Sequence, residues 1–254
     1  MTYLHILIIL FHAGLVFGCE FPPWPTPKET VKVDNPQTIK AGQPFDGQMK
    51  RYVASKGDGG QGEGQPAVFR LADGATLKNV VIGKPGADGV HCMGSCTLEN
   101  VWWEDVGEDA ATFKGDAKDT YKVIGGGAKN ASDKVFQHNG GGTLTVSNFQ
   151  VETFGKLYRS CGNCKNNGPA VPRKAFLDCI KATGPGMSLA AVNANYGDSA
   201  TLTNIQVQGK LDEVCATYEG NNTEKEPPVQ QKYTPATDGD GKTCNYKKSD
   251  VKAS

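Results

Sequence analysis

The sequence carries no formal net charge, because its 27 basic side chains balance 27 acidic ones. Proteins that bind nucleic acid through its phosphates usually present a basic face, so no nucleic-acid partner is expected. Beyond the N-terminal residues, no apolar run is long enough to cross a bilayer, and no membrane partner is expected. The middle of the chain also lacks an amphipathic helical pattern. With 32 glycines among 254 residues, the composition indicates a globular chain rich in turns.

One apolar run is present, from Leu4 to Phe17, and the small residue Gly18 follows it. The run is short for a bilayer span and typical of the apolar region of a secretory signal peptide, although a basic segment before it is missing. A buried N-terminal helix is the alternative. We expect residues 1–18 to be a signal peptide and the mature protein to be secreted.

The cysteines agree with an extracellular protein. There are eight of them, an even number that predicts disulfides in an oxidising compartment. The pairs Cys92 with Cys96 and Cys161 with Cys164 have short spacings that also resemble half-sites for zinc. The targeting segment favours disulfides over zinc. Cleavage before Cys19 would keep all eight cysteines in the mature chain, whereas cleavage after it would leave one unpaired.

A repeat runs through the centre of the chain. The pattern of threonine, an apolar residue, any residue, asparagine and an apolar residue begins at Thr76, Thr97, Thr145 and Thr201. The first two copies lie 21 residues apart, and less exact copies lie between the others. Short alternating segments bounded by glycine, asparagine and aspartate indicate strands and turns. Leucine-rich repeats have a similar period, but their regularly spaced leucines are absent.

A unit of a few short strands cannot bury its apolar face alone and must stack on its neighbours. Asparagine at the same place in each copy suits a ladder at a bend, because asparagine tolerates left-handed backbone and bonds to its own main chain. We therefore predict an all-β fold, a right-handed parallel β-helix, as one domain over residues 46–218. Residues 19–45 are proline-rich and are expected to form a lead-in or cap. Residues 219–254 are expected to be a polar tail that wraps the surface or frays.

Acidic residues recur at the interval of the repeat. Asp88 lies 20 positions before Glu108 and 21 before Asp109, so stacked coils would bring the three carboxylates to one edge. Such a cluster is repulsive unless a hard cation lies within it, and flexible oxygen ligands favour Ca²⁺ over Mg²⁺. The alternative is a solvated acidic turn.

Basic residues follow on the later coils, at Lys114, Lys134, Lys156 and Arg159. A column of cations beside a column of anions suits a polyanionic sugar chain that lies along the coils. The alternative is a set of surface salt bridges, which contribute little, and Lys156 is expected to be solvated. His91 and His138 are expected to pack within or beside the coils and are left out of the site.

Several blocks of the sequence resemble the class III pectate lyases, polysaccharide lyase family 3. These blocks are residues 68–80, 87–92, 101–110 and 159–164, and the resemblance extends from about residue 45 to about residue 215. It implies a secreted, calcium-dependent pectate lyase, with polygalacturonate as its partner. A monomer is expected. The resemblance makes Asp88, Glu108 and Asp109 the calcium ligands, and gives catalytic and substrate-binding roles to Lys114, Lys134 and Arg159.

The implied reaction is β-elimination, which starts with removal of the C5 proton of a galacturonate. Calcium would stabilise the resulting charge, and Lys114 and Arg159 would donate to the same carboxylate. We expect Lys134 to be the base, because lysine shifts its pKa readily, with Arg159 as the alternative. Two other functions stay open: a polygalacturonase-type hydrolase that uses a pair of carboxylates, and a non-catalytic pectin-binding protein.

Overall fold

The computed structural model describes residues 18–62 and 64–253. The expected signal peptide, residues 1–18, therefore lies almost wholly outside the described residues. The described chain consists of strands, turns and two short 3₁₀ helices. Its elements are β1 (Thr30–Val33), β2 (Gln37–Ile39), β3 (Phe45–Ala54), β4 (Phe69–Leu71), β5 (Ala75–Ile82), β6 (Val90–Cys92), β7 (Cys96–Trp103), β8 (Asp109–Phe113), β9 (Thr120–His138), β10 (Gly142–Ser160), β11 (Arg173–Asn193), η1 (Ala194–Tyr196), β12 (Ser199–Gln208), β13 (Leu211–Tyr218), β14 (Val229–Tyr233), β15 (Cys244–Asn245), η2 (Lys248–Asp250) and β16 (Val251–Ala253).

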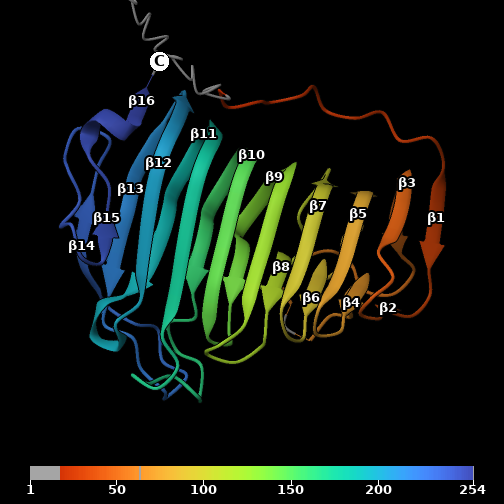
Figure 1. The fold of residues 1–254 in the computed structure, drawn as a ribbon, viewed down its shortest axis with the longest axis horizontal. Coiled ribbons are helices and arrows are strands. Elements are labelled where there is room, and N and C mark those ends of the chain that lie inside the picture. The colour runs from red at the N-terminus through yellow and green to blue at the C-terminus, as the bar shows by residue number, and fades with distance from the viewer. Residues whose placement is uncertain (1–17, 63, 254) are drawn as a thin grey trace, which may run out of the picture.

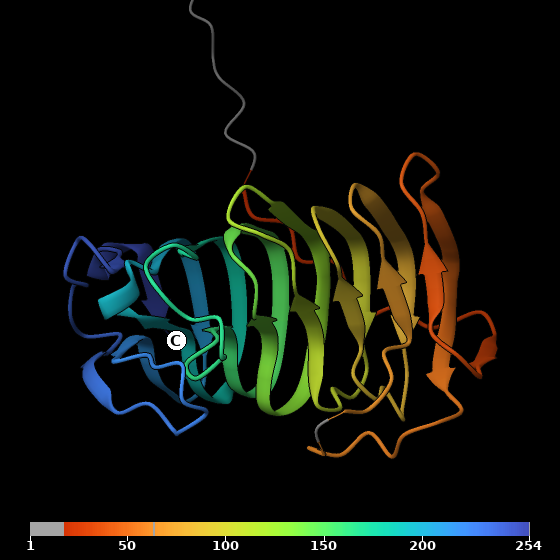
Figure 2. The same cartoon turned by 90° about the horizontal axis from the view of Figure 1, so that it is seen from below.

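The strands stack coil upon coil along one axis (Figures 1 and 2). One path of parallel pairs runs β1-β3-β5-β7-β9-β10-β11-β12-β15, and a second runs β2-β4-β6-β8-β9. The long strands β9, β10 and β11 bend and take part in both faces of the coil. Among the described strands, β13 and β14 form an antiparallel pair, and the other pairs are parallel. The predicted all-β parallel β-helix is confirmed.

One apolar residue of each coil, which follows the threonine in the four exact repeat copies, forms a column in the core. Partners in register are Leu77, Leu98, Val123, Val146, Leu177 and Leu202. Each of these side chains is at most 1% exposed, so every coil buries this residue against the coils before and after it. Burying a large aliphatic side chain stabilises a fold by roughly 1.5–3 kcal/mol, which a single coil could not obtain alone.

The repeated asparagines occupy the bend that the sequence suggests. Asn79, Asn100, Asn148 and Asn204 each have a φ of 54°, a left-handed conformation that asparagine adopts more readily than most residues. Asn100 Nδ2 donates to Asn79 Oδ1 at 2.8 Å on the previous coil. Cys179 takes the same place in β11, with a φ of 52°, and interrupts the ladder.

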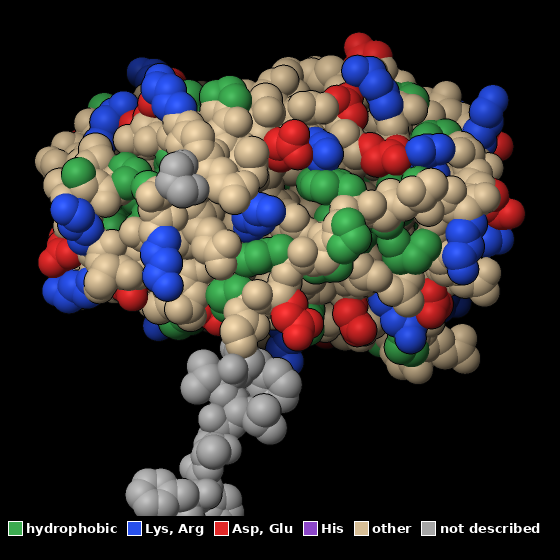
Figure 3. Space-filling model, turned by 90° about the horizontal axis from the view of Figure 1, so that it is seen from above, with side chains coloured by type: hydrophobic (Ala, Val, Ile, Leu, Met, Phe, Trp, Pro, Cys, Tyr) green, Lys and Arg blue, Asp and Glu red, His purple; other side chains and the backbone are tan. Residues whose placement is uncertain are grey.

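Residues 18–29, which we name the N-terminal strap, cross the outside of the coils from the β11 and β12 end to β1 (Figure 1). Cys19 forms a disulfide with Cys179, and Gln150 Nε2 donates to Pro22 O at 2.6 Å. The ring of Trp24 packs edge-on against Trp102, with centroids 4.8 Å apart. Figure 3 views the molecule from the strap side and shows apolar side chains gathered in the middle of that face.

The eight cysteines form four disulfides, as the sequence predicts. The pairs are Cys19–Cys179, Cys92–Cys96, Cys161–Cys164 and Cys215–Cys244. Both short spacings that resembled zinc half-sites are therefore closed as disulfides. The last pair fixes part of the C-terminal tail, and β15 and β16 in that tail pair with β12. Within residues 18–62 and 64–253, no helix has the length and apolarity that a membrane span requires.

Candidate active site

Three carboxylates meet where coils of the helix turn into β6 and β8. One oxygen each from Asp88, Glu108 and Asp109 lies within 4.8 Å of the others. The backbones approach closely here: a Cβ on Gly107 would lie 2.1 Å from Ala87 O. Glu108 N donates to that same carbonyl oxygen at 3.0 Å. The absent side chain of Gly107 therefore lets successive coils bring these acids together.

The cluster has the features of a site for a hard cation. Asp88, Glu108 and Asp109 are all at least 93% buried. Burial raises the pKa of Asp109 to about 7, and the charge of Asp88 raises it as well, against the opposing effect of Lys134. Asp88 Oδ1 and Asp109 Oδ1 have no hydrogen-bond partner among the described residues. Buried carboxylate oxygens of this kind fit a divalent cation with oxygen ligands.

His91 connects the acidic cluster to Lys114. Its Nε2 lies 2.6 Å from Asp88 Oδ2, and its Nδ1 lies 3.2 Å from Lys114 Nζ. This histidine was not predicted to belong to the site. A signal was present, since His91 lies three residues after Asp88 in the same turn and strand, but the spacing alone does not show which way its ring points.

Lys134 lies directly beside the cluster. Its Nζ is 3.6 Å from Asp109 Oδ1 and 2.6 Å from Asp133 Oδ2. Burial alone would lower the pKa of Lys134, but the carboxylates of Asp109 and Asp133 raise it above its usual value. Lys134 was predicted to stand in a column of cations, whereas its nearest charged partners are carboxylates.

Lys156 was expected to be solvated, and this was wrong. Its side chain is 17% exposed, and its Nζ lies 2.8 Å from Asp133 Oδ1. Asp133 therefore bridges Lys134 and Lys156, which face one another in register on β9 and β10. Asp133 was not predicted to belong to the site.

Arg159 completes the cationic side. Its guanidinium carbon lies 4.0 Å from the centre of the Tyr218 ring, and its Nη1 donates to Asn193 Oδ1 at 3.4 Å. The side chain is buried, and burial lowers the pKa of Arg159. Together with Lys134, Lys156 and Tyr218, Arg159 lines a groove of about 640 Å³.

All six residues selected from the sequence thus lie along one edge of the coils. The three acids form the cluster, Lys134 contacts it directly, Lys114 reaches it through His91, and Arg159 shares the groove with Lys134. A groove lined by lysine and arginine next to a carboxylate cluster can bind an anionic polymer, with a cation held beside it.

Comparison with known proteins gives a consistent result. The family model for pectate lyase matches residues 22–225. Pectate lyase E of Emericella nidulans is 46% identical over 227 residues, which is 88% of this chain and 84% of the relative. A probable pectate lyase E of Neosartorya fischeri is 45% identical, over 89% of this chain and 84% of the relative.

Solved structures show the same likeness. The catalytic domain of pectate lyase PelI from Erwinia chrysanthemi has a TM-score of 0.72 and 32% identity, over 88% of this chain and all of that chain. PelI in complex with tetragalacturonic acid has a TM-score of 0.68 and 32% identity, over 90% of this chain and 71% of that chain. The agreement of sequence, fold and relatives places this chain in the pectate lyase family.

Proposed function

We propose that this pectate lyase is a secreted, calcium-dependent enzyme that cleaves α-1,4-polygalacturonate by β-elimination. Its products would be 4,5-unsaturated oligogalacturonides released from plant cell-wall pectin. The carrying observation is the pair of buried oxygens without a hydrogen-bond partner, Asp88 Oδ1 and Asp109 Oδ1, next to the cationic groove. The related PelI structure with tetragalacturonic acid supports a polygalacturonate substrate.

In this proposal Asp88, Glu108 and Asp109 hold a calcium ion. Their donor set consists of carboxylates, which calcium prefers over softer ligands. Bound there, the ion would supply positive charge beside the substrate carboxylate and so stabilise the enediolate that proton loss creates.

The chain's own residues would perform the elimination. Lys114 and Arg159 would donate to the uronate carboxylate and orient the sugar. Lys134 would accept the C5 proton on Nζ, and the electrons of that C–H bond would form the C4–C5 double bond. The C4–O bond then breaks, and the glycosidic oxygen takes a proton from solvent. Lys134 must be neutral to act, and the carboxylates of Asp109 and Asp133 raise its pKa above the usual value, so activity is expected to be highest at alkaline pH.

Arg159 remains the alternative base. The burial that lowers its pKa favours this role, but a guanidinium stays protonated far more persistently than an amine. Its contacts with Tyr218 and Asn193 support a donor that is held in place. We therefore keep Lys134 as the proposed base.

Secretion is supported by the four disulfides, which form and persist in oxidising compartments. The N-terminal apolar run supports it as well. A monomer remains our proposal for the oligomeric state, and sedimentation equilibrium would test it directly.

The test is to incubate the purified mature protein with polygalacturonate at alkaline pH, first with calcium and then with excess chelator. Ultraviolet absorbance of the unsaturated product is read beside the release of reducing sugar. We expect the ultraviolet absorbance to rise in the presence of calcium and not to rise when chelator is in excess. Reducing sugar without absorbance would show a hydrolase, and binding without either signal would show a non-catalytic pectin-binding protein.

A further inference from the structure

The guanidinium of Arg159 is held by residues from the two coils that follow its own. Asn193 ends β11 and Tyr218 ends β13, and the two residues are partners in register. The Tyr218 ring lies 4.0 Å from the guanidinium carbon, while Asn193 Oδ1 accepts from Nη1 at 3.4 Å. Tyr218 therefore fixes the plane of the guanidinium, and Asn193 fixes the rotation of the guanidinium in that plane.

The amide of Asn193 has one orientation available. Its Nδ2 donates to Cys161 O at 2.9 Å and to Asp198 Oδ2 at 3.0 Å. Both partners are acceptors, so a flipped amide would place its oxygen against two oxygens. Oδ1 must therefore face Arg159. The backbone N–H of Asn193 is also held, because it donates to Ser160 Oγ at 3.2 Å.

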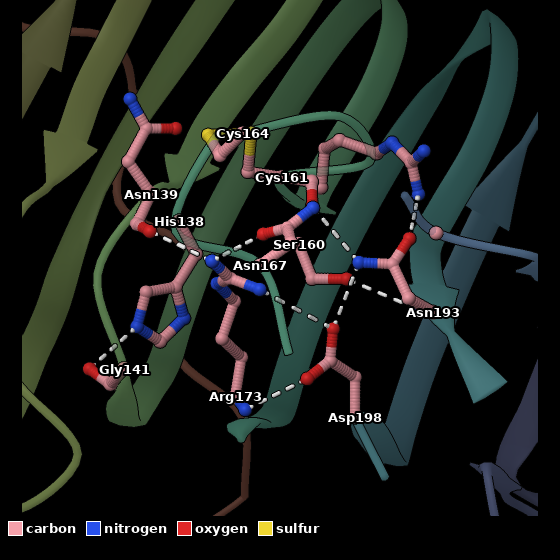
Figure 4. A network of polar contacts seen from close by, with 12 residues as sticks. His138, Asn139, Gly141, Ser160, Cys161, Cys164, Asn167, Arg173, Asn193 and Asp198 are labelled. Carbon is pink, nitrogen blue, oxygen red and sulfur yellow. Dashed lines mark hydrogen bonds and ion pairs between the residues drawn. A yellow bond between two sulfur atoms is a disulfide. The ribbon is translucent and has the colours of Figure 1, made fainter. Parts of the chain in front are cut away.

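Asp198, which orients the amide, is itself anchored in the interior (Figure 4). Its Oδ1 accepts from Arg173 N at 2.9 Å, and its Oδ2 lies 3.8 Å from Arg173 Nη1, with both side chains fully buried. Arg173 donates from Nε to Gly140 O at 2.6 Å and from Nη2 to Asn167 Oδ1 at 2.8 Å. A buried network of this kind resists reorientation, because a broken contact leaves a buried polar group without a partner.

We infer that Asn193 is a positioning residue for Arg159, which it holds against Tyr218 with its donors directed into the groove. The inference rests on the proposed function, in which Arg159 donates to the uronate carboxylate. Asn193 lies below the groove surface with none of its side chain exposed, and it is absent from the residues that line the groove. It therefore acts through Arg159 and does not itself contact the sugar.

The space around Arg159 is narrow on the side of Gly162. A Cβ on Gly162 would lie 2.1 Å from Arg159 Nη2, so the loop after β10 leaves room only for the bare backbone on that side. If Oδ1 of Asn193 is removed, the guanidinium loses its fixed acceptor and can turn within the plane that Tyr218 sets. A misplacement of about 1 Å at a reacting group can lower a rate about 100-fold.

The experiment is a double-mutant cycle on the full mature chain, with Asn193→Ala, Arg159→Ala and the double variant. Initial rates with polygalacturonate and calcium give kcat and KM for each. We expect Asn193→Ala to lower kcat by about tenfold or more, with KM changed less than about threefold. In the Arg159→Ala background the same substitution should change kcat less than about twofold, because the residue it positions is already gone.

The matched control is Asn195→Ala. Asn195 makes two hydrogen bonds of 2.8 Å to the backbone of Gly220, so its removal also weakens this end of the coil, but it does not contact Arg159. We expect it to lower the melting temperature and to leave kcat within about twofold of the original. If Asn193→Ala does not accumulate as folded protein, Asn193→Ser takes its place in the cycle and must show the same dependence on Arg159.

The affinity for saturated tetragalacturonate, measured by calorimetry with calcium, is read across the same cycle. Protein that binds the oligosaccharide without forming unsaturated product would overturn the proposed function. The positioning role would then be tested on affinity in place of kcat: Asn193→Ala should weaken binding in the original protein and change it little in the Arg159→Ala background. Independent effects of the two substitutions, or an equal loss of kcat in Asn195→Ala, would overturn the positioning role.

Discussion

Lys134 Nζ lies 3.6 Å from Asp109 Oδ1, and the two residues are partners in register on adjacent strands. Asp109 therefore belongs to the acidic cluster and also forms an ion pair with the amine of Lys134. Each additional coil along this row brings a new residue to the same place, and Lys156 follows Lys134. A substrate lying along the row would meet the acids first and the two lysines next.

Replacing Lys134 tests its role as the base. We expect Lys134→Ala to lower kcat by about 10³-fold, within the range that removal of a general base produces. Lys174→Ala, at an exposed position of β11, is the control and should retain activity. Circular dichroism confirms that both variants are folded. A Lys134→Ala enzyme that keeps more than about a tenth of the activity would show that another group accepts the proton.

The acidic cluster can be tested through stability as well as turnover. Calcium that binds only the folded protein raises its stability by RT ln(1 + [Ca²⁺]/Kd). We expect Asp109→Asn to abolish this calcium-dependent rise in the melting temperature, together with the activity. Asp34→Asn, at an exposed position before β2, should keep both. A calcium-induced shift that persists in Asp109→Asn would place the ion elsewhere.

His138 predicts a loss of stability in acid. Its Nε2 faces Gly141 O at 3.0 Å, which accepts only, so Nδ1 accepts from the Tyr158 hydroxyl at 3.0 Å in the neutral ring. Burial lowers the pKa of His138 from 6.5 to about 3. The unfolded chain therefore takes up a proton below pH 6.5 that the folded protein does not. The stability that neutral His138 contributes is fully present above pH 6.5 and declines as the pH falls toward 3.

The measurement is urea unfolding of the original protein and of His138→Gln between pH 7 and pH 4. The difference in unfolding free energy between the original protein and His138→Gln should shrink by roughly 3 kcal/mol over this range. The slope is about 1.36 kcal/mol for each pH unit below 6.5, the ordinary pKa of histidine. A difference that stays constant with pH would show that the histidine is not kept neutral by the fold.

The disulfide of the N-terminal strap should matter for stability and little for catalysis. Cys19 and Cys179 are separated by 160 positions, and closing so long a loop restricts the unfolded chain strongly. We expect Cys19→Ser combined with Cys179→Ser to lower the unfolding free energy by about 3–5 kcal/mol. Activity below the new melting temperature should be retained, because the described strap contacts reach Trp102, Asn148 and Gln150 and not the groove. A loss of activity without unfolding would contradict this.

The repeat made much of the fold predictable. An apolar residue two positions before each repeated asparagine implies a column, and the structure contains it from Leu77 to Leu202. The spacing from Asp88 to Glu108 and Asp109 similarly places all three on one edge, where they meet. These features follow from the period alone, because a parallel stack brings residues one period apart into contact.

Asp133 was not predictable in this way. Side chains of neighbouring residues in a regular strand point to opposite faces, so Asp133 and Lys134 would not be expected to meet. The register between β9 and β10 shifts at this point: Ala131 pairs with Phe154, and Lys134 pairs with Lys156. Two residues of β9 then oppose one of β10, which is a bulge that redirects a side chain. A bulge of this kind leaves no mark on the repeat.

The strap contacts were likewise hidden, because they join segments far apart in sequence. Cys19 meets Cys179, and Glu20 N donates to Asn148 Oδ1 at 3.2 Å. These contacts have a consequence for the order of assembly. Synthesis delivers the N-terminus first, yet the surface that receives the strap is complete only after residue 179 has joined its coil. We expect chains truncated before residue 179 to leave the strap open to protease, which pulse proteolysis would show. The coils can add one by one from the N-terminal end, while the strap, which is synthesised before every coil, can form its disulfide only after β11 is in place.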